Sequence, residues 1–310
     1  TKVVQDSSYK AANYALGVDL DLCNVNMTPN DDVPVANITF NGNGHTIFHV
    51  KRGEAVPNQA AGSIYGYGDH VTVKDLTIDG MTIDYIATVD TDGNYYHTFG
   101  ALAGFVGDGF TAENVSVKNV TMNLELLGEE GDAYTSAHLL PAECIGGLIG
   151  YAKGTVTLTG CTVENMTVNV TDINDSGGTQ FLIGGLIGYA DALYMQIPGE
   201  NEYSYSRDYG GNGSVSITGC TVTGMTVDKN GATGASVGGF LGGICESATS
   251  KDGKTYSVTA DIDDTSTFPA GLDSIGNVPN STGSNSTARS LDAMPAAAFE
   301  DESDEENTAA

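Results

Sequence analysis

The residues best suited to binding chemistry are tyrosines gathered in one polar stretch, residues 191–214. Tyrosine rings offer flat apolar faces that stack on sugar rings, and neighbouring Asp and Arg side chains can hydrogen-bond to hydroxyl groups. A tyrosine-rich loop also supplies rigid contact area for protein recognition. The candidate ligand-binding residues are Tyr189, Tyr194, Tyr203, Tyr205, Arg207 and Tyr209. The alternative is that these tyrosines only pack the stretch onto the rest of the protein.

A second candidate is a recurrent pair of polar residues, a threonine followed two positions later by Asp or Asn. The pairs are Thr82/Asp84, Thr121/Asn123, Thr167/Asn169 and Thr226/Asp228. If the segments that carry them lie side by side as parallel strands, the pairs stack into a flat polar row. Such a row could organise water, as in ice-binding proteins, or bind a polymer. Threonine is also simply common in strands, so an ordinary solvated face is the third interpretation.

Metal binding has weaker support. Residues 90–94 (DTDGN) and 172–175 (DIND) supply oxygen ligands of the type that calcium takes, but neither has the spacing of an EF-hand loop. The cysteines match no zinc-binding spacing; they are Cys23, Cys144, Cys161, Cys220 and Cys245. We therefore predict no metal site and no required cofactor, with calcium kept as a candidate ligand.

The sequence contains none of the common catalytic motifs, such as H-E-x-x-H, G-x-S-x-G or a phosphate-binding loop. A polysaccharide lyase would need a basic residue beside calcium-binding acids, and a hydrolase would need a close pair of carboxylates. Lys74 and Lys118 stand just before corners of the repeat described below, where we expect them to be exposed. We predict no catalytic residue.

These candidates are carried by a sequence repeat, seen in residues 76–84, 115–123, 161–169 and 220–228. Within each block, apolar residues two apart indicate short strands with one buried face. A two-residue interruption indicates a corner between strands. The second corner residue is Gly80, Asn119, Asn165 or Gly224, and Gly and Asn tolerate the left-handed backbone that a tight corner needs.

Each block follows a glycine-rich segment that we predict to be a further strand, as in residues 146–150 (GGLIG). Together they make a unit of roughly 25 residues that cannot bury its apolar face alone. Stacked units would place Cys161 near Cys220 and Met166 near Met225, all facing inward. The repeat therefore predicts an all-β protein, a right-handed parallel β-helix (a solenoid) with lateral insertions.

The unit GGLIG followed by CTVENMTV resembles the GLUG repeat of bacterial surface proteins of the right-handed parallel β-helix, pectate-lyase-like type. The stretch Phe40–Ile47 (FNGNGHTI) resembles the opening coil of the same proteins, in which we expect His45 to be a hydrogen-bonded structural residue. The resemblance covers about residues 14–262. It implies an extracellular, secreted or cell-surface location and an adhesive or wall-associated role.

The amino-acid composition limits the kinds of partner that the protein can bind. With 12 Lys and Arg against 40 Asp and Glu, the chain has a net charge of −28, which repels nucleic acid and anionic membranes. No apolar run approaches the roughly 18 residues of a membrane span. We therefore expect neither nucleic-acid binding nor membrane insertion.

We expect an N-terminal cap over residues 1–20, the β-helix over 21–262 and a polar, acidic tail over 263–310. The tail holds PNSTGSNST at residues 279–287 and six acids in residues 300–306, a composition that predicts disorder. Insertions of unequal length should lie on one side of the solenoid and carry its binding function.

The sequence thus predicts a secreted or surface-displayed, bacterial adhesin-like binding module that recognises a glycan, a host glycoprotein or another host or bacterial surface protein through its lateral insertions. Two alternatives stay open, a β-helix carbohydrate-active enzyme and a structural stalk without a ligand.

Overall fold

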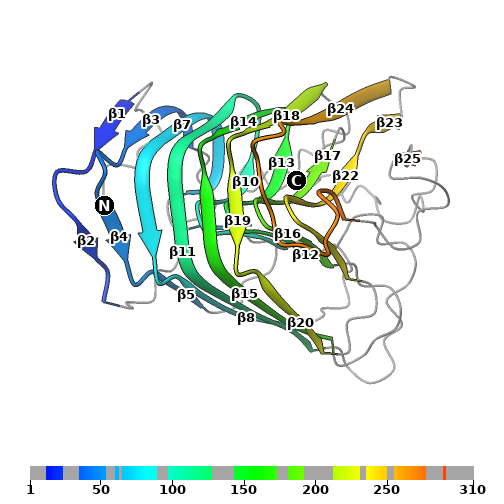
Figure 1. Ribbon diagram of the computed structural model, residues 1–310, viewed down its shortest axis with the longest axis horizontal. Coiled ribbons are helices and arrows are strands. Elements are labelled where there is room, and N and C mark those ends of the chain that lie inside the picture. The colour runs from blue at the N-terminus through cyan, green and yellow to red at the C-terminus, as the bar shows by residue number, and fades with distance from the viewer. Residues whose placement is uncertain are drawn as a thin grey trace, which may run out of the picture.

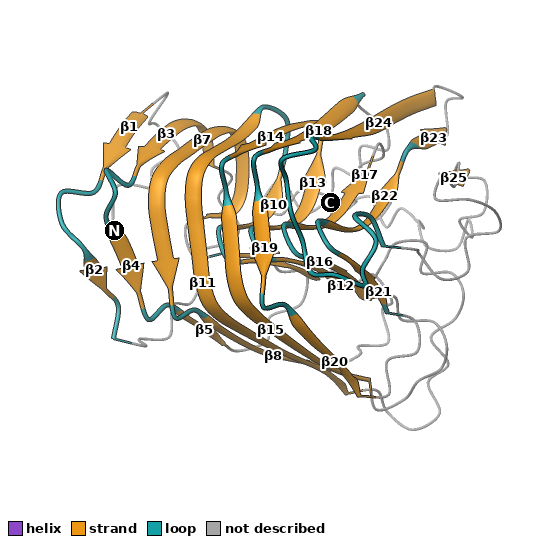
Figure 2. Cartoon of the chain, in the orientation of Figure 1, coloured by secondary structure: helices purple, strands orange, loops and turns teal. Residues whose placement is uncertain are grey.

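The computed structural model of the protein consists of β-strands wrapped around one apolar interior (Figure 1). It describes residues 12–23, 35–53, 60–62, 65–88, 97–127, 143–172, 181–191, 212–230, 235–249, 255–276 and 289–290. Figure 2 shows that every regular element in these ranges is a strand. The prediction of an all-β protein is therefore confirmed for the described residues.

Consecutive sequence repeats lie next to each other as parallel strands. The first column of strands includes β3 (Val35–Asn41), part of β7 (Tyr65–Asp79), part of β11 (Phe110–Leu127), β14 (Thr155–Thr159), β18 (Gly213–Thr218) and β24 (Thr255–Ile262). Because neighbouring strands point the same way, the chain must travel around the interior before it returns to the next position. In Figure 1 the large sheet curves so far that it nearly forms a barrel-like wrap.

Two further columns follow along the same repeats. The second column includes β4 (Thr46–Phe48), the end of β7, the middle of β11, the first part of β15 (Thr162–Asp172) and β19 (Thr221–Thr223). The third column consists of β5 (Lys51–Gly53), β8 (Thr82–Thr88), the ends of β11 and β15, and β20 (Thr226–Asn230). Strands β11 and β15 therefore continue through a corner from one column to the next.

The corners between the second and third columns lie where the sequence predicts them. Gly80, Asn119, Asn165 and Gly224 all have a positive φ, between 53° and 75°. Asn and Gly adopt this left-handed conformation at the lowest cost, which explains their recurrence. A second set of left-handed corners separates the first and second columns, at Asp75, Asn114, Gly160 and Gly219.

The interior consists of stacked apolar side chains from alternate positions. The predicted inward set of one repeat is fully buried, namely Val156, Leu158, Cys161, Val163, Met166, Val168 and Val170. The register that pairs Thr162 with Thr221 places Cys161 beside Cys220, as predicted. Both cysteines are buried free thiols, so they act as small apolar residues in this stack.

The glycine-rich segments that the structure describes in full differ from the prediction, because each of them is a bend between two strands. In residues 146–150, β12 (Glu143–Gly146) belongs to a separate five-stranded sheet, and β13 (Ile149–Lys153) belongs to the large sheet. The same bend joins β9 (His97–Gly100) to β10 (Ala103–Val106), β16 (Phe181–Gly184) to β17 (Ile187–Asp191), and β21 (Ser236–Gly238) to β22 (Leu241–Cys245). The five-stranded sheet is completed by β6 (Ala60–Ala61).

Close backbone packing explains why these bends need glycine. A Cβ atom on Gly146 would collide with the carbonyl oxygen of Ile149, and one on Gly184 would collide with that of Ile187. A Cβ on Gly188 would meet the backbone of Cys144 and Ile145, which lie in the other sheet. We call the side of the molecule that carries these bends the bend side. There the two sheets touch backbone to backbone, and no side chain fits between them.

Paired strands begin earlier than predicted at the N-terminal end. The sequence predicts a cap over residues 1–20, but β1 (Ala12–Ala15) already pairs with β3, and β2 (Leu20–Asp21) pairs with β4. Val18 and Leu20 are the large apolar residues that remain exposed in the described part of the chain.

Order also continues beyond the predicted C-terminal boundary at residue 262. Residues 263–276 follow the last full repeat, with Thr267 bridging to Thr221 and Ile275 bridging to Leu241. The Phe268 ring meets that of Phe240 edge to face at 5.0 Å, so this segment covers the end of the interior. A two-residue strand, β25 (Arg289–Ser290), pairs with β23 (Ser247–Thr249). The rest of the predicted tail lies outside the described residues.

Candidate functional site

The tyrosine-rich insertion joins β17 to β18, and both of its anchor points are fixed by the strands. Asp191 ends β17, is fully buried, and lies in register between Lys153 of β13 and Cys245 of β22. On the other side, Asn212 Oδ1 accepts a hydrogen bond of 3.0 Å from the backbone N–H of Ser257. The insertion therefore leaves one ordered strand and returns to the next ordered strand of the same repeat.

Of the candidate ligand-binding residues, the structure places one in the interior. Tyr189 is buried, with its ring centroid 6.0 Å from that of Tyr151. It is a packing residue, as the alternative interpretation held. The other candidates, Tyr194, Tyr203, Tyr205, Arg207 and Tyr209, lie outside the described residues, so their role stays a prediction.

The strand ends that flank five other insertions lie along a single edge of the molecule. Each insertion connects a third-column strand to a strand of the five-stranded sheet, across residues 54–59, 89–96, 128–142, 173–180 and 231–234. Because the flanking strands pair in register, the anchor points of these insertions follow one line, which we call the insertion edge. The prediction that insertions share one side holds for these anchor points, whereas the tyrosine-rich insertion leaves from another edge, between β17 and β18.

The predicted polar row exists on the third column. Its Cα partners are Thr82, Thr121, Thr167 and Thr226 in one line, and Asp84, Asn123, Asn169 and Asp228 in the other. We call these eight residues the Thr/Asn face. Most of them are half-buried, while Thr226 and Asp228 at the C-terminal end are exposed.

The amides of the Thr/Asn face form a directed chain of hydrogen bonds. Asn169 Nδ2 donates to Asn123 Oδ1 at 2.7 Å, and Asn123 Nδ2 donates to Asp84 Oδ1 at 2.8 Å. A carboxylate only accepts hydrogen bonds, so Asp84 is a suitable end for a chain of amide donors. Its other oxygen lies 3.6 Å from Lys51 Nζ.

A parallel amide chain runs along the corners. Asn165 Nδ2 donates to Asn119 Oδ1 at 3.2 Å, and Asn119 Nδ2 donates to Asp79 Oδ1 at 2.7 Å. The corner asparagines therefore have two roles, because they adopt the left-handed backbone and also tie three repeats together.

The first and second columns carry rows of hydroxyl groups that the sequence analysis missed. Thr72, Thr111, Thr157 and Ser216 align on the first column, and Thr77, Ser116, Thr162 and Thr221 align on the second. Thr162 Oγ1 donates to Ser116 Oγ at 2.9 Å. These rows are flanked by charged pairs in register, Lys74 with Glu113 and Lys118 with Glu164. The alternation of threonine or serine with apolar residues in the sequence could have predicted these two rows.

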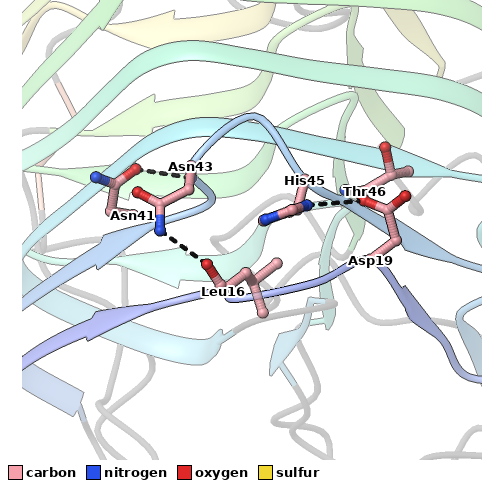
Figure 3. A network of polar contacts seen from close by, with 6 residues as sticks. All are labelled: Leu16, Asp19, Asn41, Asn43, His45 and Thr46. Atoms are coloured by element: carbon pink, nitrogen blue, oxygen red, sulfur yellow. Dashed lines mark hydrogen bonds and ion pairs between the residues drawn. The ribbon is translucent and has the colours of Figure 1, made fainter.

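A network of polar contacts holds the first repeat to the second (Figure 3). His45 Nδ1 lies 3.2 Å from Asp19 Oδ1, which also accepts a 2.9 Å hydrogen bond from the backbone N–H of Thr46. Asn43 Nδ2 donates to Leu16 O at 2.8 Å. His45 is therefore hydrogen-bonded, as predicted. The pKa of Asp19 lies below its usual value. The main cause is the hydrogen bond from the backbone N–H of Thr46, and the contact with His45 lowers the pKa further.

A second histidine repeats this arrangement, with His49 Nδ1 2.9 Å from Asp21 Oδ1. The hydrogen bond from His49, followed by one from the backbone N–H of Cys23, lowers the pKa of Asp21. The sequence did not reveal either histidine–aspartate pair, because the partners are separated by 26 and 28 residues.

Two other carboxylates connect neighbouring repeats at corners. Asp108 Oδ1 accepts from the backbone N–H of Thr155 at 2.8 Å, which is the main cause of its lowered pKa. Asp263 Oδ1 accepts from Ser266 Oγ at 2.6 Å and from the backbone N–H of Gly219 at 3.1 Å. Hydrogen bonds from Ser266 and Thr265 contribute most to lowering the pKa of Asp263 to about 2. These carboxylates act as ties between repeats.

In the described ranges, His, Cys, Asp and Glu form no group of three or more that could hold a metal ion. The candidate calcium clusters lie almost wholly outside these ranges, so calcium binding stays a prediction. Cys144 lies in register with Thr98 and Leu182, and Cys245 lies in register with Asp191. The thiol of Cys245 donates to Ser247 O at 3.5 Å.

Comparison with known protein families, curated proteins and solved structures found no match. Among the described residues there is no helix with the length and apolar character needed to cross a membrane.

Proposed function

We propose that the columns form a right-handed parallel β-helix of the GLUG-repeat type, and that the protein is a secreted or cell-surface binding module. It recognises a glycan or a glycoprotein through its lateral insertions, in the manner of an adhesin. The observation that supports the proposal is the placement of the residues that flank the insertions, which lie on ordered strands of a regular scaffold.

The tyrosine-rich insertion is the strongest candidate for the contact surface. Its anchors are the buried Asp191 and the hydrogen-bonded Asn212, so the scaffold fixes both ends of a segment of 20 residues, 192–211. That segment contains four tyrosines and one arginine, which are residue types suited to stacking on sugars and to hydrogen-bonding hydroxyl groups. Fixed ends reduce the conformational entropy that a binding segment loses on contact with its ligand.

The proposal is tested with an array of glycans and glycoproteins, with and without calcium. The intact chain is compared with a variant in which residues 192–211 are replaced by a short Gly/Ser turn, while Asp191 and Asn212 are kept. The matched control replaces residues 128–142 on the insertion edge with the same turn. We expect specific binding by the intact chain and the control, and loss of binding in the first variant.

Two results would contradict the proposal. Absence of specific binding by the intact chain would favour a structural stalk. Release of products from a polysaccharide on the array would favour a carbohydrate-active enzyme.

A further inference from the structure

The Thr/Asn face offers hydrogen-bonding groups that the scaffold leaves partly available. An asparagine amide has two N–H donors and two lone pairs on its oxygen. The amide chain uses one N–H and one acceptor position of Asn123, and one N–H of Asn169. Thr121 and Thr167 lie on the same two strands as Asn123 and Asn169, and each carries a hydroxyl group that can both donate and accept a hydrogen bond.

These groups repeat at a regular interval across the strands. Thr121 pairs with Thr167, and Asn123 pairs with Asn169, on parallel strands that lie about 4.8 Å apart. The neighbouring rungs, Thr82/Asp84 and Thr226/Asp228, extend the array in both directions. A ligand that matches it must present hydroxyl groups repeatedly along its length, which describes a linear polymer better than a small molecule.

The charges of this face restrict the polymer further. Asp84 and Asp228 mark its two ends, and Glu125 follows Asn123 by two positions on β11. Lys51 lies in register with Thr82, and its Nζ, 3.6 Å from Asp84 Oδ2, offsets one of these three acids. The chain as a whole carries a charge of −28. A polyanion would be repelled both by these local acids and by the field of the whole protein. The central rungs themselves are uncharged, so the face suits a neutral ligand.

The third column also ends at the insertion edge. Strands β8, β11, β15 and β20 each lead directly into one of its insertions. A polymer that lies across these strands would therefore run beside the row of insertion anchors. The first and second columns carry hydroxyl rows too, but these rows are flanked in their central repeats by the charged pairs Lys74 with Glu113 and Lys118 with Glu164.

We propose that the Thr/Asn face binds a neutral, linear polysaccharide that lies across the strands, with its hydroxyl groups hydrogen-bonded to Thr121, Thr167 and Asn169. This inference rests on the proposed function, because it names the class of glycan and gives it a second contact surface on the scaffold itself.

The test changes two hydroxyl groups and little else. The face variant carries Thr121→Val and Thr167→Val, which keep the side-chain shape and favour strands. The control carries Thr111→Val and Thr157→Val, which make the same change in the same two repeats on the first column. Full-length proteins are titrated with a soluble galactomannan, a neutral β-glucan, and polygalacturonate as the polyanion. Thermal unfolding followed by circular dichroism verifies that both variants keep the fold.

We expect the intact chain and the control to bind a neutral polysaccharide equally, and the face variant to bind about tenfold more weakly, since two hydrogen bonds are lost. Equal binding by both variants, a preference for polygalacturonate, or no binding of either neutral polymer would overturn the inference.

The two proposals fail separately. If replacement of residues 192–211 abolishes glycan binding while the face variant binds normally, the inference is wrong and the proposed function stands. If neutral polysaccharide binds without the insertion but not to the face variant, the inference stands and the insertion is not the contact surface. If the intact chain binds nothing on the array and neither neutral polymer, both are wrong.

Discussion

The bend side and the Thr/Asn face belong to the same repeats, but they are held together in different ways. On the bend side, two sheets meet backbone to backbone, and Gly146, Gly184 and Gly188 have no space for even a methyl group. On the Thr/Asn face, strands are joined by their ladder and by side-chain amides at the surface, where Thr167 and Asn169 are only half-buried. The difference indicates that the residue types of the repeat are strictly constrained where its backbone segments touch, and less constrained where its side chains face solvent.

The largest loss of folding stability is expected for Gly184→Ala on the bend side. The new Cβ would collide with the carbonyl oxygen of Ile187, and backbone atoms cannot move aside as a side chain can. We expect a loss of stability of about 3 kcal/mol or more, or failure to fold, measured by urea unfolding. Gly17→Ala is the control, because a Cβ there meets nothing within 4 Å. Similar stability of the two variants would show that the bend side is not tightly constrained.

A smaller but substantial loss of folding stability is expected when the buried Met166, which lies next to the Thr/Asn face, is truncated. Met166 is fully buried between Asn165 and Thr167 along the strand. Met166→Ala leaves a cavity and should cost about 2–5 kcal/mol, whereas Met166→Leu should cost less than about 1.5 kcal/mol. The unfolding midpoint in urea measures both. An Ala variant as stable as the parent would mean that the interior of this column is loosely packed.

The corner amide chain should have an intermediate effect. Asn119→Ala removes the 2.7 Å hydrogen bond to Asp79 and places alanine at a φ of 53°. We expect a loss of about 1–2 kcal/mol. Asn119→Gly relieves the backbone strain and should recover part of this loss. If the glycine variant is the less stable of the two in thermal unfolding, the left-handed backbone is not what selects asparagine here.

Substitution on the Thr/Asn face itself should hardly change stability. Thr167→Ala removes a half-buried hydroxyl group from a strand whose ladder is unaffected, so the change should stay within about 0.5 kcal/mol. Differential scanning calorimetry of the variant beside Gly184→Ala gives the contrast in one experiment. A loss comparable to that of the glycine variant would remove the distinction between the two sides.

The smallest effect concerns pH at a corner that belongs to neither side. Asp263 has a folded pKa of about 2, below its ordinary value near 3.8, because Ser266 and Thr265 donate hydrogen bonds to it. A lowered folded pKa contributes stability above the unfolded pKa, and this contribution is lost as pH falls from about 4 toward 2. Asp263→Asn should therefore unfold with a weaker pH dependence in this window. An unchanged pH profile of the unfolding midpoint would show that Asp263 is not a tie between repeats.

Sequence reasoning succeeded where the repeat itself carries the information. The alternation around Met166 predicted the buried positions, and the recurrence of Asn165 and its equivalents predicted the left-handed corners. The stacking of Cys161 beside Cys220 followed from the same alignment. These features depend only on neighbours along the chain and on equivalent positions one repeat away.

The glycine-rich segments were misinterpreted for a physical reason. A run such as GGLIG is compatible with a strand, and its alternation cannot show that Gly146 faces the carbonyl oxygen of Ile149. That contact depends on the bend between β12 and β13, which belong to different sheets. Tyr189 was placed at a binding site for a similar reason, since its exposure depends on what covers β17.

By itself, the sequence determined the strand columns, the corners and the stacked interior, because short-range periodicity and backbone preference act through residues that recur. Only the tertiary structure decided that the bends join two sheets, that Asp19 and Asp21 reach His45 and His49, and that residues 263–276 cover the last repeat. These contacts join segments that are far apart in the sequence, and their energies depend on packing in space, which a pattern along the chain does not contain.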